Sequence, residues 1–518
     1  MAVDIFGYGF STREAVYFAL GLLLLAFVVH RVQRWLPLRH VPVQDIHQLS
    51  EKYGPVIRVA PTQVVVMDSD ALYRISGART EYRKSEWYKI HRILREDDHV
   101  SNIRDPELRK DRLKRVMPAY TGRDTEDLEK GFDRAISSFI RLIDRKYACN
   151  PGDCVPMDFG EKAHFYTLDA IGEIAYSEPF GILEKDSDID NIIVTLKSGL
   201  PVIVALGYNM NIWGLLQKWP IYLLQPHEGQ EVGLGAMIKS VDKVITKRLS
   251  LDDKSKRDIL QSFIDHGLPL SALRQEVGLQ FLAGSDTVAS FLRTTFLQLL
   301  TNPTAYHALQ VELDAFYSSS PSESDISSEN IISDAQARTL PYLQAVVREG
   351  LRLFPPATSC PFPKVVPHST ISATFSLSSP TITKQGDVIQ GVYLPPGTEI
   401  DTALGVYGIC RDKQFWGADA DCFRPERWLQ AEKEVKVVAG DAAEDTRFAQ
   451  MLRKVELVFG SVQYVCAGRS LAYVEMRKVI AELMRRYNWS LVDPLKPPII
   501  VNNGVWETRD FWVRAEKR

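Results

Sequence analysis

The feature that most constrains this chain is one cysteine in a short glycine-containing loop, directly before a helical pattern. The loop spans Phe459 to Gly468 (FGSVQYVCAG), and an amphipathic run from Ser470 to Tyr487 follows it. This order predicts that the Cys466 sulfur lies at a helix N-terminus, where free backbone N–H groups and the helix dipole favour a thiolate. A thiolate in such a place serves as a nucleophile, a redox thiol or a metal ligand.

The sequence near the loop offers Cys466 no reaction partner. None of the ten His residues lies close to it in sequence, and the next cysteine along the chain, Cys422, is 44 residues away. A nucleophilic cysteine needs a partnered histidine, and a redox thiol needs a second cysteine close by. Metal ligation remains, with a buried structural cysteine as the alternative.

A second unusual feature is an acid beside a hydroxyl inside an apolar helix. The predicted helix runs from residue 269 to 300, and its middle reads Ala283-Gly284-Ser285-Asp286-Thr287. Ala283 and Gly284 remove side-chain bulk, which lets a flat cofactor and a small ligand approach the backbone and loosens the helix. The alternative is a Ser/Asp/Thr patch that bonds back to its own helix.

A third feature is an acid and an arginine three residues apart on the predicted helix that begins at Pro341. Glu349 and Arg352 form this pair, whose default interpretation is a surface salt bridge of small value. The apolar residues around the pair indicate burial, where the two charges need further partners. A second arginine is available downstream in Phe423 to Trp428 (FRPERW).

These segments resemble the haem-thiolate monooxygenases of the cytochrome P-450 family. The cysteine loop is similar to the family pattern Phe-x-x-Gly-x-Arg-x-Cys-x-Gly: Phe459, Cys466 and Gly468 match, whereas Val462 and Tyr464 replace the usual Gly and Arg. The other segments occur in family order, and the resemblance covers roughly residues 51 to 515. Within the family the chain looks most like fungal membrane-bound secondary-metabolism enzymes of the pisatin-demethylase type.

The resemblance implies a mainly α fold with small β-sheets (α+β) and haem b, iron protoporphyrin IX, as cofactor. Cys466 would be the axial ligand of the haem iron. Asp286 and Thr287 would be catalytic, delivering protons during oxygen activation. Further haem contacts would come from Phe459, Tyr464, Arg112, Arg115, Lys364, Ala283 and Gly284. Glu349, Arg352 and Arg427 would form a buried ion triad.

Two departures from the family pattern have physical consequences in the loop. Tyr464 supplies one neutral hydrogen bond to a haem propionate where Arg supplies charge, so haem affinity would rest more on Arg112 or Arg115 and on Lys364. Val462 lacks the freedom of glycine at positive φ, and strain is expected there.

The resemblance also implies the electron source and the substrate class. Electrons would come from NADPH through a separate cytochrome P-450 reductase carrying FAD and FMN, with cytochrome b5 as a further candidate donor. Residues 109–115 form a basic cluster, either a solvated face or a surface shared between haem and donor protein. The substrate would be a hydrophobic small molecule. Alternatives are a catalytically impaired haem-binding protein and a reductase-independent isomerase or dehydratase. The net charge of −3 gives nucleic-acid binding no support.

The N-terminus predicts a membrane anchor. Residues 15–30 are uncharged, and basic and aromatic residues from Arg31 to Arg39 follow without a cleavage site. We expect a lumenal segment (1–14), a single-pass anchor (15–30), a linker (31–50) and a cytosolic catalytic domain (51–518) at the endoplasmic reticulum membrane. A cleaved signal peptide is the alternative. Apolar residues 200–224 fit either core or a substrate-entry lid against the membrane.

Overall fold

The structure is a computed structural model that describes residues 3–5, 8–10, 44–94, 97–125, 127–148, 155–219, 234–250, 256–319, 330–367, 386–437 and 446–518. The predicted anchor (15–30) and most of the predicted linker (31–50) lie outside these residues. Within the linker range, a helix already begins at Gln44.

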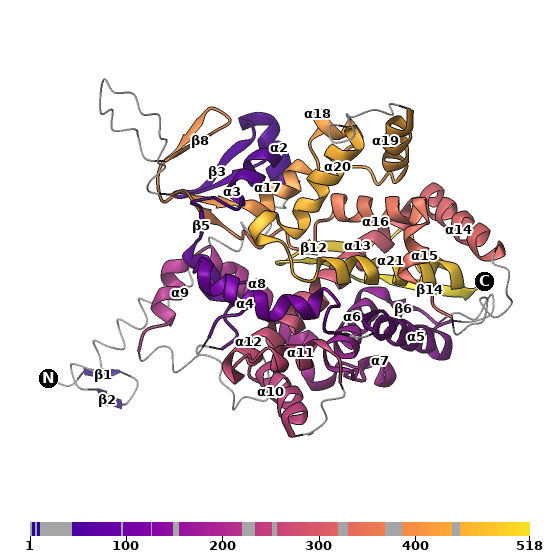
Figure 1. Cartoon of the computed structure of the whole chain (residues 1–518), viewed down its shortest axis with the longest axis horizontal. Coiled ribbons are helices and arrows are strands. Elements are labelled where there is room, and N and C mark those ends of the chain that lie inside the picture. Colours follow the sequence, from indigo (N-terminus) through magenta and orange to yellow (C-terminus); the bar gives the residue numbers. More distant parts are fainter. Residues whose placement is uncertain are drawn as a thin grey trace.

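Helices make up most of the described chain (Figure 1). Their bounds are α2 Gln44–Tyr53, α3 Ser69–Ile75, α4 Pro106–Tyr120, α5 Leu128–Lys146, α6 Phe159–Tyr176, α7 Ile182–Lys185, α8 Ile192–Gly207, α9 Met210–Leu216, α10 Leu234–Ser250, α11 Ile259–Asp265, α12 Leu270–Leu279, α13 Ser285–Thr301, α14 Pro303–Ser318, α15 Asp334–Arg338, α16 Pro341–Leu353, α17 Thr402–Ile409, α18 Lys413–Trp416, α19 Glu426–Val437, α20 Arg447–Glu456 and α21 Arg469–Arg486. Helix α4 shows why such bounds are readable from sequence: Asp105 caps it by accepting hydrogen bonds from two backbone N–H groups, and Pro106 fits its first turn.

The strands form small sheets. Their bounds are β1 Val3–Ile5, β2 Tyr8–Phe10, β3 Val56–Ala60, β4 Gln63–Val66, β5 Arg83–Lys84, β6 Met157–Asp158, β7 Lys364–Val365, β8 Asp387–Ile389, β9 Val392–Leu394, β10 Glu399–Asp401, β11 Tyr487–Leu491, β12 Ile499–Asn502, β13 Trp506–Arg509 and β14 Trp512–Lys517. A five-stranded sheet has the order β3-β4-β10-β7-β5, a three-stranded sheet the order β11-β14-β6, and the other strands pair in twos. A mainly α fold with small sheets is therefore confirmed.

The five-stranded sheet combines distant parts of the chain. Strands β7 and β10 join β3, β4 and β5, which come from the start of the described domain. Strand β10 pairs in parallel with β4 and antiparallel with β7. The physical reason is burial: every residue of β4 is buried, so its backbone needs a partner on both edges.

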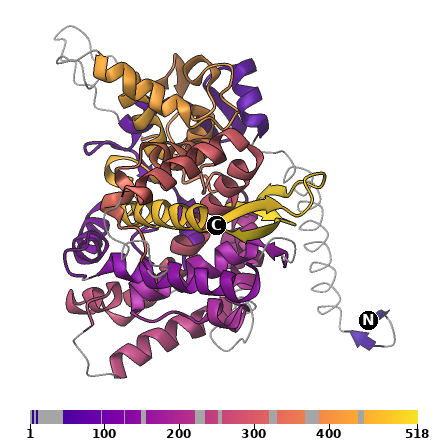
Figure 2. The same cartoon turned by 90° about the vertical axis from the view of Figure 1, so that its right-hand side faces the viewer.

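Helix α13 lies at the centre of the molecule and packs against α6, α16 and α21. Most of its side chains are buried, and the Phe296 ring stacks on Phe159 of α6 with ring centroids 4.0 Å apart. Figure 2 shows the yellow C-terminal helix and strands crossing the middle of the molecule. The N-terminal end of α13 is thereby held between helices from distant parts of the sequence.

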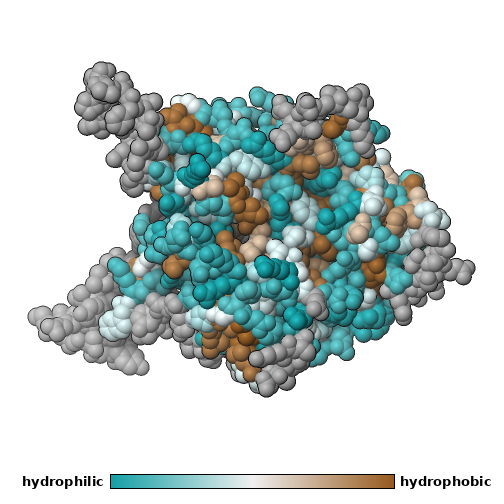
Figure 3. Space-filling model, in the orientation of Figure 1, coloured by the Kyte–Doolittle hydropathy of each residue, from teal (hydrophilic) through white to brown (hydrophobic). Residues whose placement is uncertain are grey.

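One stretch of the described chain, Ile189–Gly207, is long and apolar enough to cross a membrane by length and composition. The core helix of a soluble protein passes the same test, so this stretch alone does not indicate a span. Its exposed apolar side chains include Val194 and Val202. On the face in Figure 3, hydrophobic residues form small patches separated by hydrophilic surface.

Candidate functional site

The cysteine loop is built from two short 3₁₀ turns between α20 and α21. These are Leu457–Phe459 and Val462–Tyr464. The Cys466 N–H donates to the Phe459 carbonyl at 2.7 Å, which closes the loop. Gly460 has φ 74°, and a Cβ there would lie 2.3 Å from the Tyr464 carbonyl oxygen, so only glycine fits. Helix α21 begins three residues after Cys466, as the sequence predicts.

The protein surrounds Cys466 deeply although part of its surface reaches solvent. Burial raises the pKa of the Cys466 thiol above its usual value, while the Gly468 N–H, the charge of Arg469 and the Arg469 N–H lower it. Burial is the larger effect, so the free thiol is protonated at neutral pH. A bound metal ion reverses this balance, because a coordinating thiol is deprotonated outright.

Val462 carries the strain expected at this position. Its φ is 45°, in the left-handed region that a β-branched residue rarely adopts. Half of its surface is exposed, so packing does not require the valine side chain.

We expect Val462→Gly to stabilise the protein by about 1 kcal/mol, because relief of left-handed strain outweighs the added chain entropy. Thermal unfolding followed by circular dichroism measures this. Val465, in the same loop at φ −61°, is the matched control. Val465→Gly should destabilise, and stabilisation by both changes would contradict the strain argument.

The predicted long helix is interrupted at its small residues. Helix α12 passes into a π-helical segment, Gln280–Gly284, before α13 begins. Ala283 is exposed, whereas the other residues of this segment are buried or half-buried, and the Thr287 hydroxyl donates to the Ala283 carbonyl at 2.8 Å. A Cβ on Gly284 would lie 2.4 Å from Ile171 Cδ1 of α6. Gly284 therefore permits close helix packing, whereas Ala283 is the residue that presents open backbone surface.

Asp286 is buried on the first turn of α13. Its Oδ1 lies 3.0 Å from His164 Nε2 on α6, and His164 is fully buried. Sequence reasoning missed His164, because a single histidine more than 100 residues away carries no local signal.

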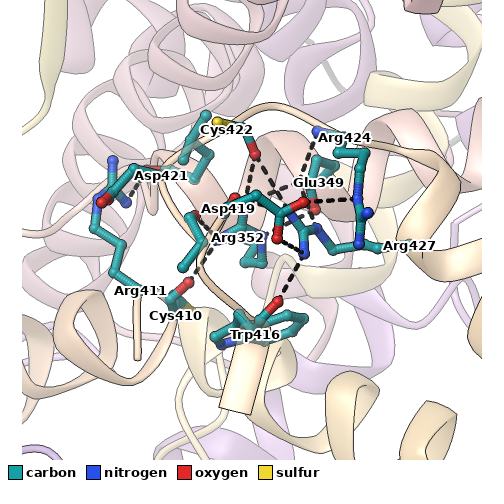
Figure 4. Close-up of polar contacts among 12 residues, drawn as sticks. Glu349, Arg352, Cys410, Arg411, Trp416, Asp419, Asp421, Cys422, Arg424 and Arg427 are labelled. Carbon is teal, nitrogen blue, oxygen red and sulfur yellow. Dashed lines mark hydrogen bonds and ion pairs between the residues drawn. The ribbon is translucent and has the colours of Figure 1, made fainter. Parts of the chain in front are cut away.

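The structure brings Glu349, Arg352 and Arg427 together as one buried group (Figure 4). Arg352 forks onto the Glu349 carboxylate with Nε–Oε2 2.9 Å and Nη2–Oε1 2.8 Å. Arg427 Nε donates to the same Oε1 at 3.0 Å. Burial raises the pKa of Glu349, but Arg352 and Arg427 outweigh it and hold the pKa below its usual value.

Three cations gather around the Tyr464 ring: Lys84, Arg109 and Lys364, here called the cation cluster. Lys364 Nζ lies 3.4 Å, Arg109 Cζ 5.3 Å and Lys84 Nζ 5.7 Å from the ring centroid. Burial and the neighbouring cations lower the pKa of both lysines well below the usual value. The buried Nε of Arg109 has no hydrogen-bond partner among the residues that the structure describes. Of these three, sequence reasoning found only Lys364.

The other two predicted arginines point elsewhere. Arg112 pairs with buried Glu276 at 3.0 Å and with Asp97 at 3.4 Å. Arg115 is partly exposed, pairs with Asp111 at 3.1 Å and donates to the Gly267 carbonyl at 3.2 Å. The structure therefore does not bring Arg112 and Arg115 into the cation cluster. Phe459 packs against Tyr473 of α21, with ring centroids 5.1 Å apart.

A helix-rich fold with a cysteine loop before one helix and a small-residue break in another is the architecture of a haem-thiolate protein. The chain belongs to the cytochrome P450 family, whose family model matches residues 23–510. It is a P450 monooxygenase, and its relatives are fungal enzymes.

Two relatives illustrate the similarity. Cytochrome P450 monooxygenase ABA1 of Pyricularia oryzae is 32% identical over 468 residues, which cover 89% of this chain and 84% of that protein. Cytochrome P450 monooxygenase aba1 of Botryotinia fuckeliana is 30% identical over 476 residues, covering 91% and 86%. The family and its fungal branch, predicted from short motifs, are confirmed.

The described residues fit the haem that the family implies. The cation cluster gathers buried positive charge, which is unfavourable without an anionic partner. Two propionate groups would neutralise it and would satisfy the free Arg109 Nε. Cys466 would supply the iron ligand, and exposed Ala283 would leave room for a flat ring.

We expect Arg109→Leu to speed haem transfer to apomyoglobin about tenfold, because the variant loses one charge-assisted hydrogen bond to the haem, worth about 1.5 kcal/mol. Arg115→Leu, on the same helix but facing solvent, is the matched control and should leave the rate unchanged. Faster loss in Arg115→Leu alone would assign the propionate contact to Arg115 instead.

Proposed function

We propose that this monooxygenase binds haem b through Cys466 and oxidises a hydrophobic small molecule. Electrons come from NADPH through a separate reductase that carries FAD and FMN, with cytochrome b5 as a second candidate donor. The observation that carries the proposal is that the chain contains two features together. The Cys466 loop precedes α21, and Asp286 and Thr287 lie at the break before α13. A chain that only bound haem would not need an acid and a hydroxyl at that break.

The residues of this chain divide the work as follows. Bound haem supplies the redox chemistry that activates dioxygen. Cys466 donates electron density as a thiolate ligand, and the cation cluster holds the acidic edge of the ring. Thr287 keeps its hydroxyl beside the break through its bond to the Ala283 carbonyl. Asp286 moves protons towards that hydroxyl.

The substrate class follows from a second apolar cluster. Its buried members are Trp87, Tyr88, Ile90, Val204 and Cys360. Partly buried hydrophobic residues of α8, α9 and the loop after α16 pack against it. Apolar side chains of this kind favour contact with largely apolar ligands, which a few polar groups then orient. A hydrophobic metabolite suits this apolar cluster. The proposed role is in fungal secondary-metabolite biosynthesis, and the similarity to fungal P450 monooxygenases supports it.

The membrane assignment belongs to the same proposal. Residues 15–30 anchor the enzyme in the endoplasmic reticulum membrane with the catalytic domain in the cytosol. The apolar stretch Ile189–Gly207 then offers a second surface to the lipid, beside which a hydrophobic substrate enters.

The experiment uses membranes that contain the enzyme and a fungal NADPH-dependent reductase. An organic extract of fungal culture is incubated with them under ¹⁸O₂, and products are followed by mass spectrometry. We expect products that require NADPH and carry one ¹⁸O atom. Products formed without NADPH would favour the isomerase or dehydratase alternative. Haem binding without NADPH oxidation would favour the impaired haem protein.

A further inference from the structure

Asp286 belongs to a buried polar group that extends well beyond the break in the helix. His164 is fully buried, and Nε2 lies 3.0 Å from Asp286 Oδ1. Neither ring nitrogen has a well-aligned hydrogen-bond partner within the described structure. Burying an imidazole with spare donor capacity costs free energy, so its place beside one carboxylate calls for a reason.

The same group continues along α13 towards the surface. Arg293, two turns after Asp286, donates from Nε to the Gly160 carbonyl at 2.8 Å, and its Nη1 and Nη2 have no partner in the described structure. Burial lowers the pKa of Arg293, and this effect is opposed by three carboxylates, those of Asp286, Glu507 of β13 and Asp158. Glu507 and Lys197 of α8 are partly exposed. Glu507 interacts electrostatically with Arg293, Lys197 and Asp286, so partly exposed charged groups are coupled to buried Asp286.

His164 is neutral in this setting. Burial lowers its pKa below the usual value; Asp286 opposes this effect, and Arg293 and Lys197 add to it. A neutral imidazole can donate one N–H to the carboxylate, which orients Asp286 without placing a fixed countercharge against it. Such a carboxylate stays free to accept and release protons.

We propose that His164 is a positioning residue for proton delivery by Asp286, and that Glu507, Lys197 and Arg293 line the route by which protons reach it from solvent. The inference rests on the proposed function, because it needs Asp286 to carry protons during oxygen activation. It adds the partner that holds Asp286 and the side of the molecule, between α8 and β13, from which protons enter.

The test compares His164→Gln, whose amide can keep a donor near the position of Nε2, with His164→Leu, which has none. Membranes that contain each variant, the reductase and NADPH, but no added substrate, are expected to release superoxide and hydrogen peroxide, and the two products are measured separately. Superoxide forms from O₂ and one electron, whereas hydrogen peroxide needs O₂, two electrons and two protons. We expect the superoxide share to rise about threefold or more in His164→Leu and to stay near wild type in His164→Gln.

A second readout does not depend on turnover. Because the folded-state pKa of His164 is depressed, the unfolded chain binds a proton that the folded chain rejects, and stability falls as pH drops below about 6.5. His91 and His99, with pKa values of about 3 and about 4, contribute equally to wild type and variant. The unfolding midpoint of His164→Gln should therefore fall less between pH 7.5 and pH 5.5.

Asp286→Asn separates the two proposals. If it leaves the superoxide share unchanged, the proton role of Asp286 in the proposed function fails. Suppose instead that Asp286→Asn raises the superoxide share. If His164→Leu then does not raise it, or if His164→Leu and His164→Gln give the same share, only the role of His164 is overturned. If the unfolding midpoint of His164→Gln changes with pH as much as that of wild type, the neutral, buried state of His164 is overturned.

Discussion

Replacing Cys466 with alanine should remove the strongly red-shifted Soret band of the reduced, carbon-monoxide-treated protein and lower NADPH-dependent turnover by on the order of 1,000-fold or more. The reason is chemical: of the described cysteines, only Cys466 sits in a loop next to a helix N-terminus with backbone N–H groups directed at its sulfur. Burial keeps the free thiol protonated, so binding of iron must displace a proton. Haem incorporation into the wild type should therefore weaken at low pH.

The control for this experiment is Cys422→Ala. Cys422 is exposed, and its hydrogen bonds are made by its backbone: its carbonyl accepts from Arg352 at 3.1 Å and Arg427 at 3.4 Å, and its N–H donates to the Asp419 carbonyl at 2.9 Å. Removing its side chain should leave the spectrum unchanged. A wild-type spectrum typical of a histidine-ligated haem, or a red-shifted band that survives in Cys466→Ala, would end the thiolate assignment.

Sequence reasoning succeeded where a local pattern has one physical solution. The start of helix α4 can be read from the sequence, because Asp105 caps it and Pro106 fits its first turn. The break at residues 280–284 followed from two small residues in an apolar helix. The burial expected for Glu349 and Arg352 indicated that a further partner was needed, and the family resemblance identified that partner as Arg427.

Sequence reasoning fell short where the position of a side chain depends on distant parts of the chain. Residues 109–115 are basic on every side of α4, so the sequence cannot tell which side chain points inward. The structure decides this through Glu276 and Asp97, which take Arg112 and leave Arg109 for the cation cluster. His164 and Lys84 reach the site from remote elements and carry no motif. The contact of Gly284 with Ile171 of α6 was not foreseen either, and the predicted cofactor contact of Gly284 stays a prediction.

The largest effect on stability should come from the ion triad. Arg352→Ala would leave buried Glu349 with one arginine. It would also remove the hydrogen bonds that Arg352 donates to three backbone carbonyls, those of Cys410, Ala420 and Cys422. Removing one partner of a buried ion pair costs about 3–5 kcal/mol, because the remaining charge stays desolvated. We expect loss of folded holoprotein at 37 °C, measured as haem content of purified protein and as thermal midpoint.

Two further variants decide whether the geometry or only the charge matters. Arg352→Lys keeps the charge but loses the fork that reaches both carboxylate oxygens, so it should recover only part of the stability. Arg424 is the matched surface control: its side chain is 41% exposed and pairs with Asp419 at 3.0 Å. Arg424→Ala should cost about 0–1 kcal/mol. Helices α17 and α19 both pack against α20, which contacts the first turn of the cysteine loop. Equal losses in Arg352→Ala and Arg424→Ala would refute the idea that the triad stabilises the segment between α17 and α19.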